Sequence, residues 1–204
     1  MQLSKHYQHA ILPLVVIFSP GVEAFSLSNF SLGYGGEVVK TGSNKTLYAH
    51  GPDLALGFAL TPTINLNSSY SSRSGDITTS GAKTEYERSD IALGLRYHRP
   101  LISWLVEWYV QGSILRNKSS WKDSSGSRDS EDWGHREAVG LRQTLFEKLI
   151  DAHVALEHSD YGSHSSDALI AGASLRVGSN SAIGVTYTLT KDGETTSYGF
   201  SSRF

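Results

Sequence analysis

Apolar and polar or small residues alternate with a period of two from Phe25 to the end of the chain. Successive side chains of a β-strand point to opposite faces of the sheet, so this period predicts strands rather than helices. Leu54, Leu56 and Phe58, for example, alternate with the smaller residues between them. Turn-forming residues separate ten such segments, and an irregular first or last hairpin would leave eight. The pattern therefore predicts an all-β fold.

The composition narrows the choice to one β-rich domain. The 204 residues include 20 Gly, 10 Tyr and 4 Trp but only 5 Pro, a mixture that suits a twisted sheet. Cysteine is absent, which excludes disulfide frameworks, thiolate metal sites and cysteine nucleophiles. The formal net charge of −2 provides no basic surface for nucleic acid, so we expect no nucleic-acid partner.

Residues 1–24 follow the pattern of a cleaved signal peptide. A weakly basic start precedes the apolar run Ala10–Phe18, and a helix-breaking turn leads to the small residue Ala24 at the expected cleavage site. A buried N-terminal strand or helix is the alternative. We favour the signal peptide because the run does not alternate and the pattern changes abruptly at Phe25. Residues 25–204 are then the exported domain.

The connections between the predicted strands fall into two classes that alternate along the chain. The short turns are 61–63, 98–100, 146–149 and 178–181, and the mostly longer polar loops are 41–50, 75–84, 117–131, 162–166 and 191–194. Short turns at one rim and long loops at the other are typical of bacterial outer-membrane barrels. Both termini then lie at the short-turn rim, on the periplasmic side.

The chemistry of the two strand faces distinguishes a membrane barrel from a soluble sandwich. One face is a broad band of Leu, Ile, Val and aromatic residues, and the other carries Gly, Ser and a few charges. The aromatic residues gather near strand ends, with Tyr34, Tyr70, Tyr86, Trp133, Tyr161 and Tyr198 toward the long loops and Phe30, Tyr97, Trp104, Phe146 and Phe204 toward the short turns. Such girdles lie at membrane interfaces. Because lipid satisfies no backbone hydrogen bond, we expect a closed antiparallel transmembrane β-barrel.

The last strand ends in alternating aromatic residues, Tyr198, Phe200 and the terminal Phe204. In this the chain resembles the small outer-membrane β-barrel proteins of Gram-negative bacteria, in the porin-like superfamily. The resemblance implies export through the periplasm to the outer membrane, contact with its lipid and lipopolysaccharide, and recognition of the last strand by the barrel assembly machinery. It supplies no catalytic motif and implies no cofactor.

If the apolar face meets lipid, the charged residues of the opposite parity face the interior. The predicted interior charges are Glu37, Asp53, Asp90, Glu107, Asp151 and Glu157 together with Arg88, Arg96, Arg136, Arg142, Arg176 and Arg203. We expect Glu107 to lie between Arg96 and Arg142, and the two acids of the seventh strand to meet arginines on both sides. Buried charges are tolerated when paired, and a barrel of this size has a narrow interior. The network therefore favours a plugged lumen over the alternative, a narrow path for small solutes.

Two further regions carry candidate chemistry. His153, His158 and His164 occur with Ser159, Ser165, Ser166 and Asp160 in one serine-rich stretch. A His–Ser pair beside a carboxylate can activate a nucleophile, so a lipid hydrolase at the rim is an alternative, but we favour a solvated loop because such proximity is common in a serine-rich stretch without an oxyanion-hole motif. We expect no enzyme activity and no metal site. The loop 117–131 is the candidate contact surface for a partner, and an ordinary solvated loop is the equally acceptable alternative.

Overall fold

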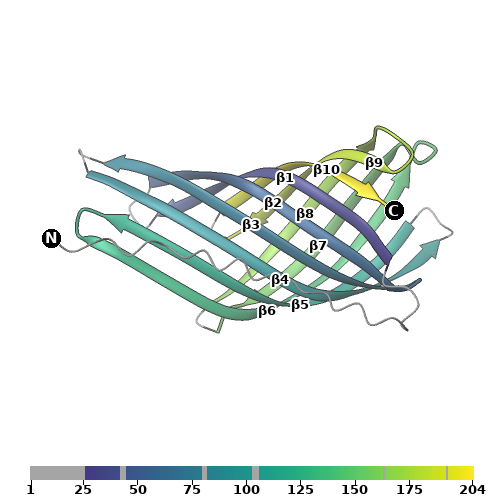
Figure 1. The fold of residues 1–204 in the computed structure, drawn as a ribbon, viewed down its shortest axis with the longest axis horizontal. Coiled ribbons are helices and arrows are strands. Elements are labelled where there is room, and N and C mark those ends of the chain that lie inside the picture. The colour runs from purple at the N-terminus through teal and green to yellow at the C-terminus, as the bar shows by residue number, and fades with distance from the viewer. Residues whose placement is uncertain (1–25, 42–44, 80–81, 103–105, 163, 192) are drawn as a thin grey trace.

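The computed structural model describes residues 26–204 except 42–44, 80–81, 103–105, 163 and 192. Its strands form one closed antiparallel barrel of ten strands, in which the last strand pairs with the first (Figure 1). The prediction of a ten-stranded closed barrel is confirmed. The predicted signal peptide, residues 1–24, lies outside the described residues. Within the described part of the chain, no helix is long and apolar enough to cross a membrane.

Six long strands precede four short ones. The long strands are β1 (Ser26–Thr41), β2 (Lys45–Thr61), β3 (Ile64–Thr79), β4 (Ala82–Ile102), β5 (Val106–Asp123) and β6 (Gly126–Leu145). The short strands are β7 (Ile150–Asp160), β8 (Ser165–Arg176), β9 (Ser181–Thr190) and β10 (Gly193–Arg203). About 9–11 tilted residues suffice to cross a bilayer. The short strands match this length, whereas β1–β6 extend beyond it at one end of the barrel (Figure 1).

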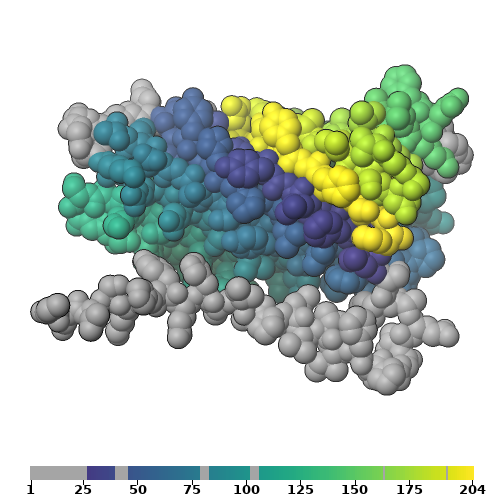
Figure 2. Space-filling model, turned by 45° about the horizontal axis from the view of Figure 1, so that its top comes forward, coloured from purple at the N-terminus to yellow at the C-terminus, as the bar shows by residue number. Residues whose placement is uncertain are grey.

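We call the end with the β1–β2, β3–β4 and β5–β6 turns the hairpin end. The opposite end, where β10 finishes at Arg203, is the C-terminal end. At the line where the sheet closes, the side chains of β1 and β10 lie directly against each other (Figure 2). Phe200 faces Leu32 there, and Tyr198 faces Tyr34.

The described residues of the predicted loops 41–50, 75–84 and 117–131 are mostly strand, which corrects the sequence prediction. The β3–β4 ladder continues to the pair Thr79 and Ala82, and the β5–β6 ladder to Asp123 and Gly126. These segments are polar because their outer faces lie beyond the apolar belt, not because they are irregular. Polarity of one face does not end a strand whose backbone ladder continues.

The predicted turn 98–100 is also corrected. Residues 98–100 remain in β4, which pairs with β5 as far as Ile102 and Val106, so the strand continues through the predicted turn. Proline at position 100 is compatible with this strand end because the ladder is irregular between Pro100 and Ile102.

Apolar side chains form a belt on the outside of the barrel. The exposed residues include Leu32, Leu93, Leu95, Ile114, Val139, Leu141, Leu156, Leu169, Leu175, Ile183, Val185 and Phe200. Tyr34, Trp133 and Tyr198 flank this belt and are each more than half exposed. An exposed apolar surface of this extent requires an apolar solvent, so the barrel has the outer face of a membrane-spanning protein.

Two members of the predicted aromatic girdle lie inside instead. Tyr86 and Tyr161 are 5% and 7% exposed. The parity of the strands explains this, because Tyr86 shares its face with Arg88, and Tyr161 shares its face with Ser159. Proximity to a strand end therefore did not predict which face an aromatic ring takes.

Tyr86 belongs to a small apolar core inside the hairpin end. This hairpin core consists of Leu47, Ala49 and Tyr86 with Val39, Ile77 and Trp121 packed against them. Leu47 and Ala49 are fully buried, and the Tyr86 and Trp121 ring centroids are 4.5 Å apart. The extensions of β1–β5 thus pack on one another, which stabilises strands that no membrane supports.

Candidate functional site: the interior ion-pair network

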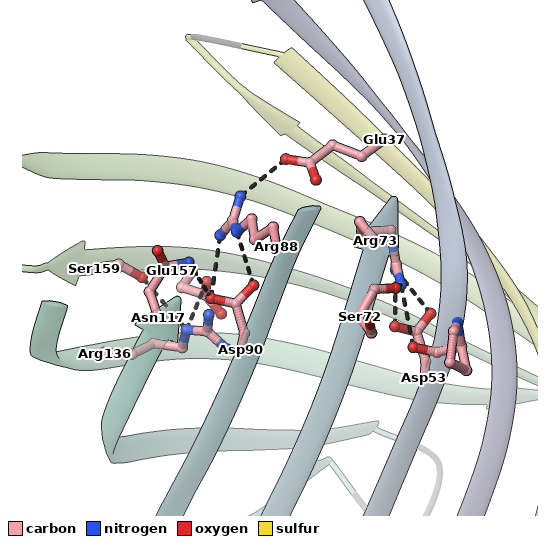
Figure 3. A network of polar contacts seen from close by, with 11 residues as sticks. Glu37, Asp53, Ser72, Arg73, Arg88, Asp90, Asn117, Arg136, Glu157 and Ser159 are labelled. Carbon is pink, nitrogen blue, oxygen red and sulfur yellow. Dashed lines mark hydrogen bonds and ion pairs between the residues drawn. The ribbon is translucent and has the colours of Figure 1, made fainter. Parts of the chain in front are cut away.

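Arg88 joins strands on different sides of the barrel (Figure 3). Its Nη1 lies 2.9 Å from Glu37 Oε1, and its Nε lies 2.9 Å from Asp90 Oδ2. Asp90 is two residues along the same strand, β4, but Glu37 belongs to β1. Because β2 and β3 separate β1 from β4 in the sheet, the Arg88–Glu37 pair spans the interior.

The same cluster continues to β5, β6 and β7. Asn117 Nδ2 donates a hydrogen bond of 2.6 Å to Asp90 Oδ1. Arg136 Nε lies 3.1 Å from Glu157 Oε1 and donates to Ser159 Oγ at 3.4 Å. Figure 3 shows Arg88 and Asn117 meeting at Asp90, with the Arg136 and Glu157 pair beside them. Polar groups from five strands thereby fill the middle of the barrel.

Arg73 of β3 forms a separate pair that the sequence reasoning missed. It is 6% exposed, and its Nη2 donates to Asp53 at 2.8 and 3.0 Å. Its Nη1 donates to the carbonyl oxygens of Gly51 at 3.1 Å and Ser72 at 2.8 Å. The signal was present in the parity: continuing the alternation of β3 past Tyr70 places position 73 inside. The sequence prediction followed the alternation of this strand only as far as Tyr70.

Asp151 collects three arginines near the C-terminal end. Its Oδ2 lies 3.1 Å from Arg142 Nη2, 3.2 Å from Arg176 Nη2 and 3.2 Å from Arg203 Nη2. Thr144 Oγ1 also donates to Asp151 Oδ1 at 2.6 Å. Asp151 is on β7 and Arg203 on β10, so this contact too spans strands that are not neighbours.

Arg96 and Glu107 take partners other than those expected. Arg96 Nε donates to Gln111 Oε1 at 3.0 Å, and its Cζ lies 4.3 Å from the centre of the Tyr109 ring. Glu107 Oε2 instead lies 3.1 Å from His98 Nδ1. The ladder does place Glu107 opposite Arg142, but Arg142 leans toward Asp151. Parity determines the face of a side chain and not the direction in which it leans along the strand.

The structure therefore brings ten of the twelve predicted interior charges into ion pairs of opposite sign with one another or with Arg73. They are Glu37, Asp53, Arg88, Asp90, Arg136, Arg142, Asp151, Glu157, Arg176 and Arg203. A cavity of about 240 Å³ lies among these pairs, and Asp53, Asp90 and Arg136 contribute to its lining.

The histidines and serines of the predicted rim site do not converge. His158 faces outward, where its Nδ1 lies 2.7 Å from Asp167 Oδ1. Ser159 faces inward and is 5% exposed, because adjacent residues of a strand take opposite faces. His164 stacks on the Tyr161 ring at 4.9 Å. Among the residues that the structure describes, no three His, Asp or Glu side chains form a group that could hold a metal ion.

The C-terminal aromatic residues face outward. Tyr198 and Phe200 are exposed on β10, and Phe204 follows the strand and is exposed as well. The suggested recognition by assembly machinery needs such accessible side chains, and it stays a prediction.

Comparison with known proteins yields similarity of fold only. No family model matches the chain, and no curated protein matches it. An outer membrane channel from Pseudomonas putida F1 aligns with a TM-score of 0.54 at 11% sequence identity, covering 92% of this chain and 100% of the channel. Neisserial surface protein A aligns with a TM-score of 0.48 at 12% identity, covering 86% and 97% of the two chains.

The attachment invasion locus protein Ail of Yersinia pestis aligns with a TM-score of 0.46 at 13% identity, covering 88% of this chain and 100% of Ail. Of these three structures, the Pseudomonas channel has a TM-score above 0.5, and at 11% identity its similarity concerns architecture alone. Together, the closed antiparallel sheet, the apolar outer belt and the paired interior charges lead to one conclusion: the chain has the fold of an outer-membrane β-barrel protein.

Proposed function

We propose that this protein is a closed, non-catalytic barrel of the Gram-negative outer membrane that displays its extended hairpins as a contact surface. The observation that carries the proposal is the closure of the interior. Ion pairs cross the lumen between Arg88 and Glu37 and between Arg203 and Asp151. The hairpin core, with Leu47 fully buried, occupies the hairpin end.

Closing the interior costs little free energy, because the charges in the middle are paired and the side chains of the hairpin core are apolar. The charges in the middle are paired, which is the condition under which buried charges are tolerated. The hairpin core removes apolar side chains from water, at about 25 cal/mol per Å² of apolar surface. A solute would have to break both layers to pass through the barrel. We therefore infer a structural or adhesive role in the envelope.

The contact surface that we propose is the β5–β6 extension, residues 116–123 and 126–134. Its outer face is polar and exposed, and it carries a small charge network in which Glu131 lies 2.7 Å from Arg116 and 3.2 Å from Lys118. Trp133 is 63% exposed beside it, with Arg116 Cζ 5.7 Å from the ring centre. Arginine and tryptophan are the residues that most often dominate binding interfaces.

Bilayer recording tests the closure. The purified barrel should show no steady conductance, whereas the double variant Glu37→Ala/Arg88→Ala should, because it removes a pair that crosses the lumen. The matched control is Lys83→Ala/Glu85→Ala, which removes an exposed pair of similar length, 3.0 Å. Steady conductance of the unmodified protein would contradict the proposal.

Cell attachment tests the contact surface. Cells that express a barrel in which residues 117–131 are replaced by a short Asn-Gly turn should attach to cultured epithelial cells less well than cells with the full chain. The control replaces residues 191–194 at the β9–β10 turn in the same way. Equal attachment by all three strains would remove the hairpin from the proposal.

A second candidate function is a narrow channel for small solutes, and the interior cavity of about 240 Å³ favours it. Asp53, Asp90 and Arg136 in the cavity lining provide polar contacts for a hydrated ion. In that case the same recordings would show small conductance steps in the unmodified protein, with a size that changes in Arg136→Ala.

A further inference from the structure

The charges of the interior network are unevenly distributed along the barrel axis. Toward the hairpin end, three arginines, Arg73, Arg88 and Arg136, meet four acids, Glu37, Asp53, Asp90 and Glu157. Toward the C-terminal end, four arginines, Arg96, Arg142, Arg176 and Arg203, meet two acids, Glu107 and Asp151. The C-terminal end of the network therefore has an excess of positive charge.

The excess is concentrated around one carboxylate. Arg142, Arg176 and Arg203 all place Nη2 within 3.1 to 3.2 Å of the same oxygen, Asp151 Oδ2. One negative charge thus faces three positive charges in a partly desolvated space. Each guanidinium has five N–H donors, so three guanidinium groups offer more hydrogen bonds than one shared carboxylate can accept. The three side chains are 27% to 48% exposed, so their remaining donors reach the space at this mouth.

Arg96 is an independent indication of the same kind. Its two contacts are with neutral groups, the Gln111 amide and the Tyr109 ring. The nearby acid Glu107 shares a hydrogen bond with His98, with 3.1 Å between its Oε2 and the His98 Nδ1. Among the described residues, the guanidinium of Arg96 is therefore positioned by contacts with neutral groups and not by a salt bridge.

We propose that the C-terminal mouth of the barrel is a binding site for an oxyanion, the phosphate or carboxylate group of a small soluble molecule or of a lipid headgroup. Planar guanidinium groups donate pairs of hydrogen bonds that match these oxyanions. An anion bound there would offset the repulsion among Arg142, Arg176 and Arg203.

Calorimetric titration with inorganic phosphate tests the site. The refolded barrel in a zwitterionic detergent, at constant ionic strength set with chloride, should bind one phosphate saturably. Arg176→Gln should weaken binding by at least about tenfold, as expected for the loss of a hydrogen bond to a charged group. Arg136→Gln is the matched control, because Arg136 is paired with Glu157 in the other half of the interior, and its affinity should be unchanged.

Asp151→Asn provides a test in the opposite direction. Removing the one negative charge among the three arginines should tighten phosphate binding, whereas a merely structural role of the cluster would not. Arg142→Gln replaces Arg176→Gln if the latter does not refold. Absence of saturable binding, or equal loss in Arg136→Gln and Arg176→Gln, would overturn the proposal.

Competition distinguishes the two sources of the oxyanion. Mixed micelles that contain short-chain phosphatidic acid should displace phosphate if the mouth accepts a lipid headgroup. If they do not displace it while citrate does, the site takes a soluble anion. Both results support the oxyanion site and assign its source.

Discussion

Arg88 on β4 and Glu37 on β1 form an ion pair of 2.9 Å although two strands separate them in the sheet. Such a contact exists only because the sheet closes into a barrel narrow enough for two side chains to span it. It links the interior of the barrel to its stability, because each partner would otherwise leave a charge in a poorly hydrated space.

Glu37→Ala should therefore destabilise the barrel. Arg88 keeps Asp90 but loses its partner across the lumen, at a cost of about 2 kcal/mol for an interior charge left partly unpaired. Urea unfolding in detergent micelles measures the change. The control Glu85→Ala, which removes the partner of the exposed Lys83, should leave the unfolding free energy unchanged. Equal stability of Glu37→Ala and the unmodified protein would mean that the crossing pair contributes nothing.

Gly35→Ala should also destabilise the barrel. A Cβ at this position would collide with the Arg73 guanidinium and with Ser197 Oγ, and so disturb the Arg73–Asp53 pair. Overpacking of this kind costs about 1–3 kcal/mol. Gly112→Ala is the matched control, because nothing lies within 4 Å of its added Cβ. The temperature at which the folded band is lost in detergent gels should fall for the first variant only.

The β6–β7 turn contains three successive residues with positive φ that are not glycine: Phe146 at 48°, Glu147 at 53° and Lys148 at 75°. The left-handed conformation costs roughly 1–2 kcal/mol for a residue with a side chain. Glu147→Gly should therefore stabilise the barrel by about 1 kcal/mol. Ser179→Gly, in the β8–β9 turn and without positive φ, should destabilise it slightly. Thermal unfolding of the two variants would show opposite signs.

The β5–β6 extension should loosen in acid. The Arg116 guanidinium that donates to Glu131, with Lys118 nearby, holds the pKa of the Glu131 carboxyl below its usual value. A depressed pKa contributes stability that is fully present above the unfolded value of 4.5 and is lost as the pH falls through the folded pKa. Amide exchange in residues 116–131, corrected for its intrinsic pH dependence, should accelerate between about pH 5 and pH 3. Glu131→Gln should abolish this dependence, and a persistent effect in that variant would assign it elsewhere.

Export can be tested at the N-terminus. If residues 1–24 are a signal peptide, the protein isolated from the outer membrane should begin at Phe25. N-terminal sequencing measures this directly. A chain that retains Ala24 and the apolar run before it would contradict the prediction.

The alternation of the chain was sufficient to predict the number of strands, the closure of the sheet and the face that each regular strand turns outward. Leu93 and Leu95 are exposed and Arg96 lies inside, because successive side chains of a strand point to opposite faces of the sheet. The same parity selected twelve interior charges, ten of which form ion pairs of opposite sign.

Only the tertiary structure decided where strands end and which groups meet. The strands β3 and β5 continue through polar residues that were predicted to be loops, and Ile77 and Trp121 on their inner faces pack into the hairpin core, a contact between segments distant in the chain. Glu107 contacts His98, and Asp151 contacts three arginines. Strand register and side-chain length determine which of several suitably charged partners each acid contacts. The periodic sequence determines the face to which each side chain points. Which side chains meet across the lumen is determined only when the barrel closes.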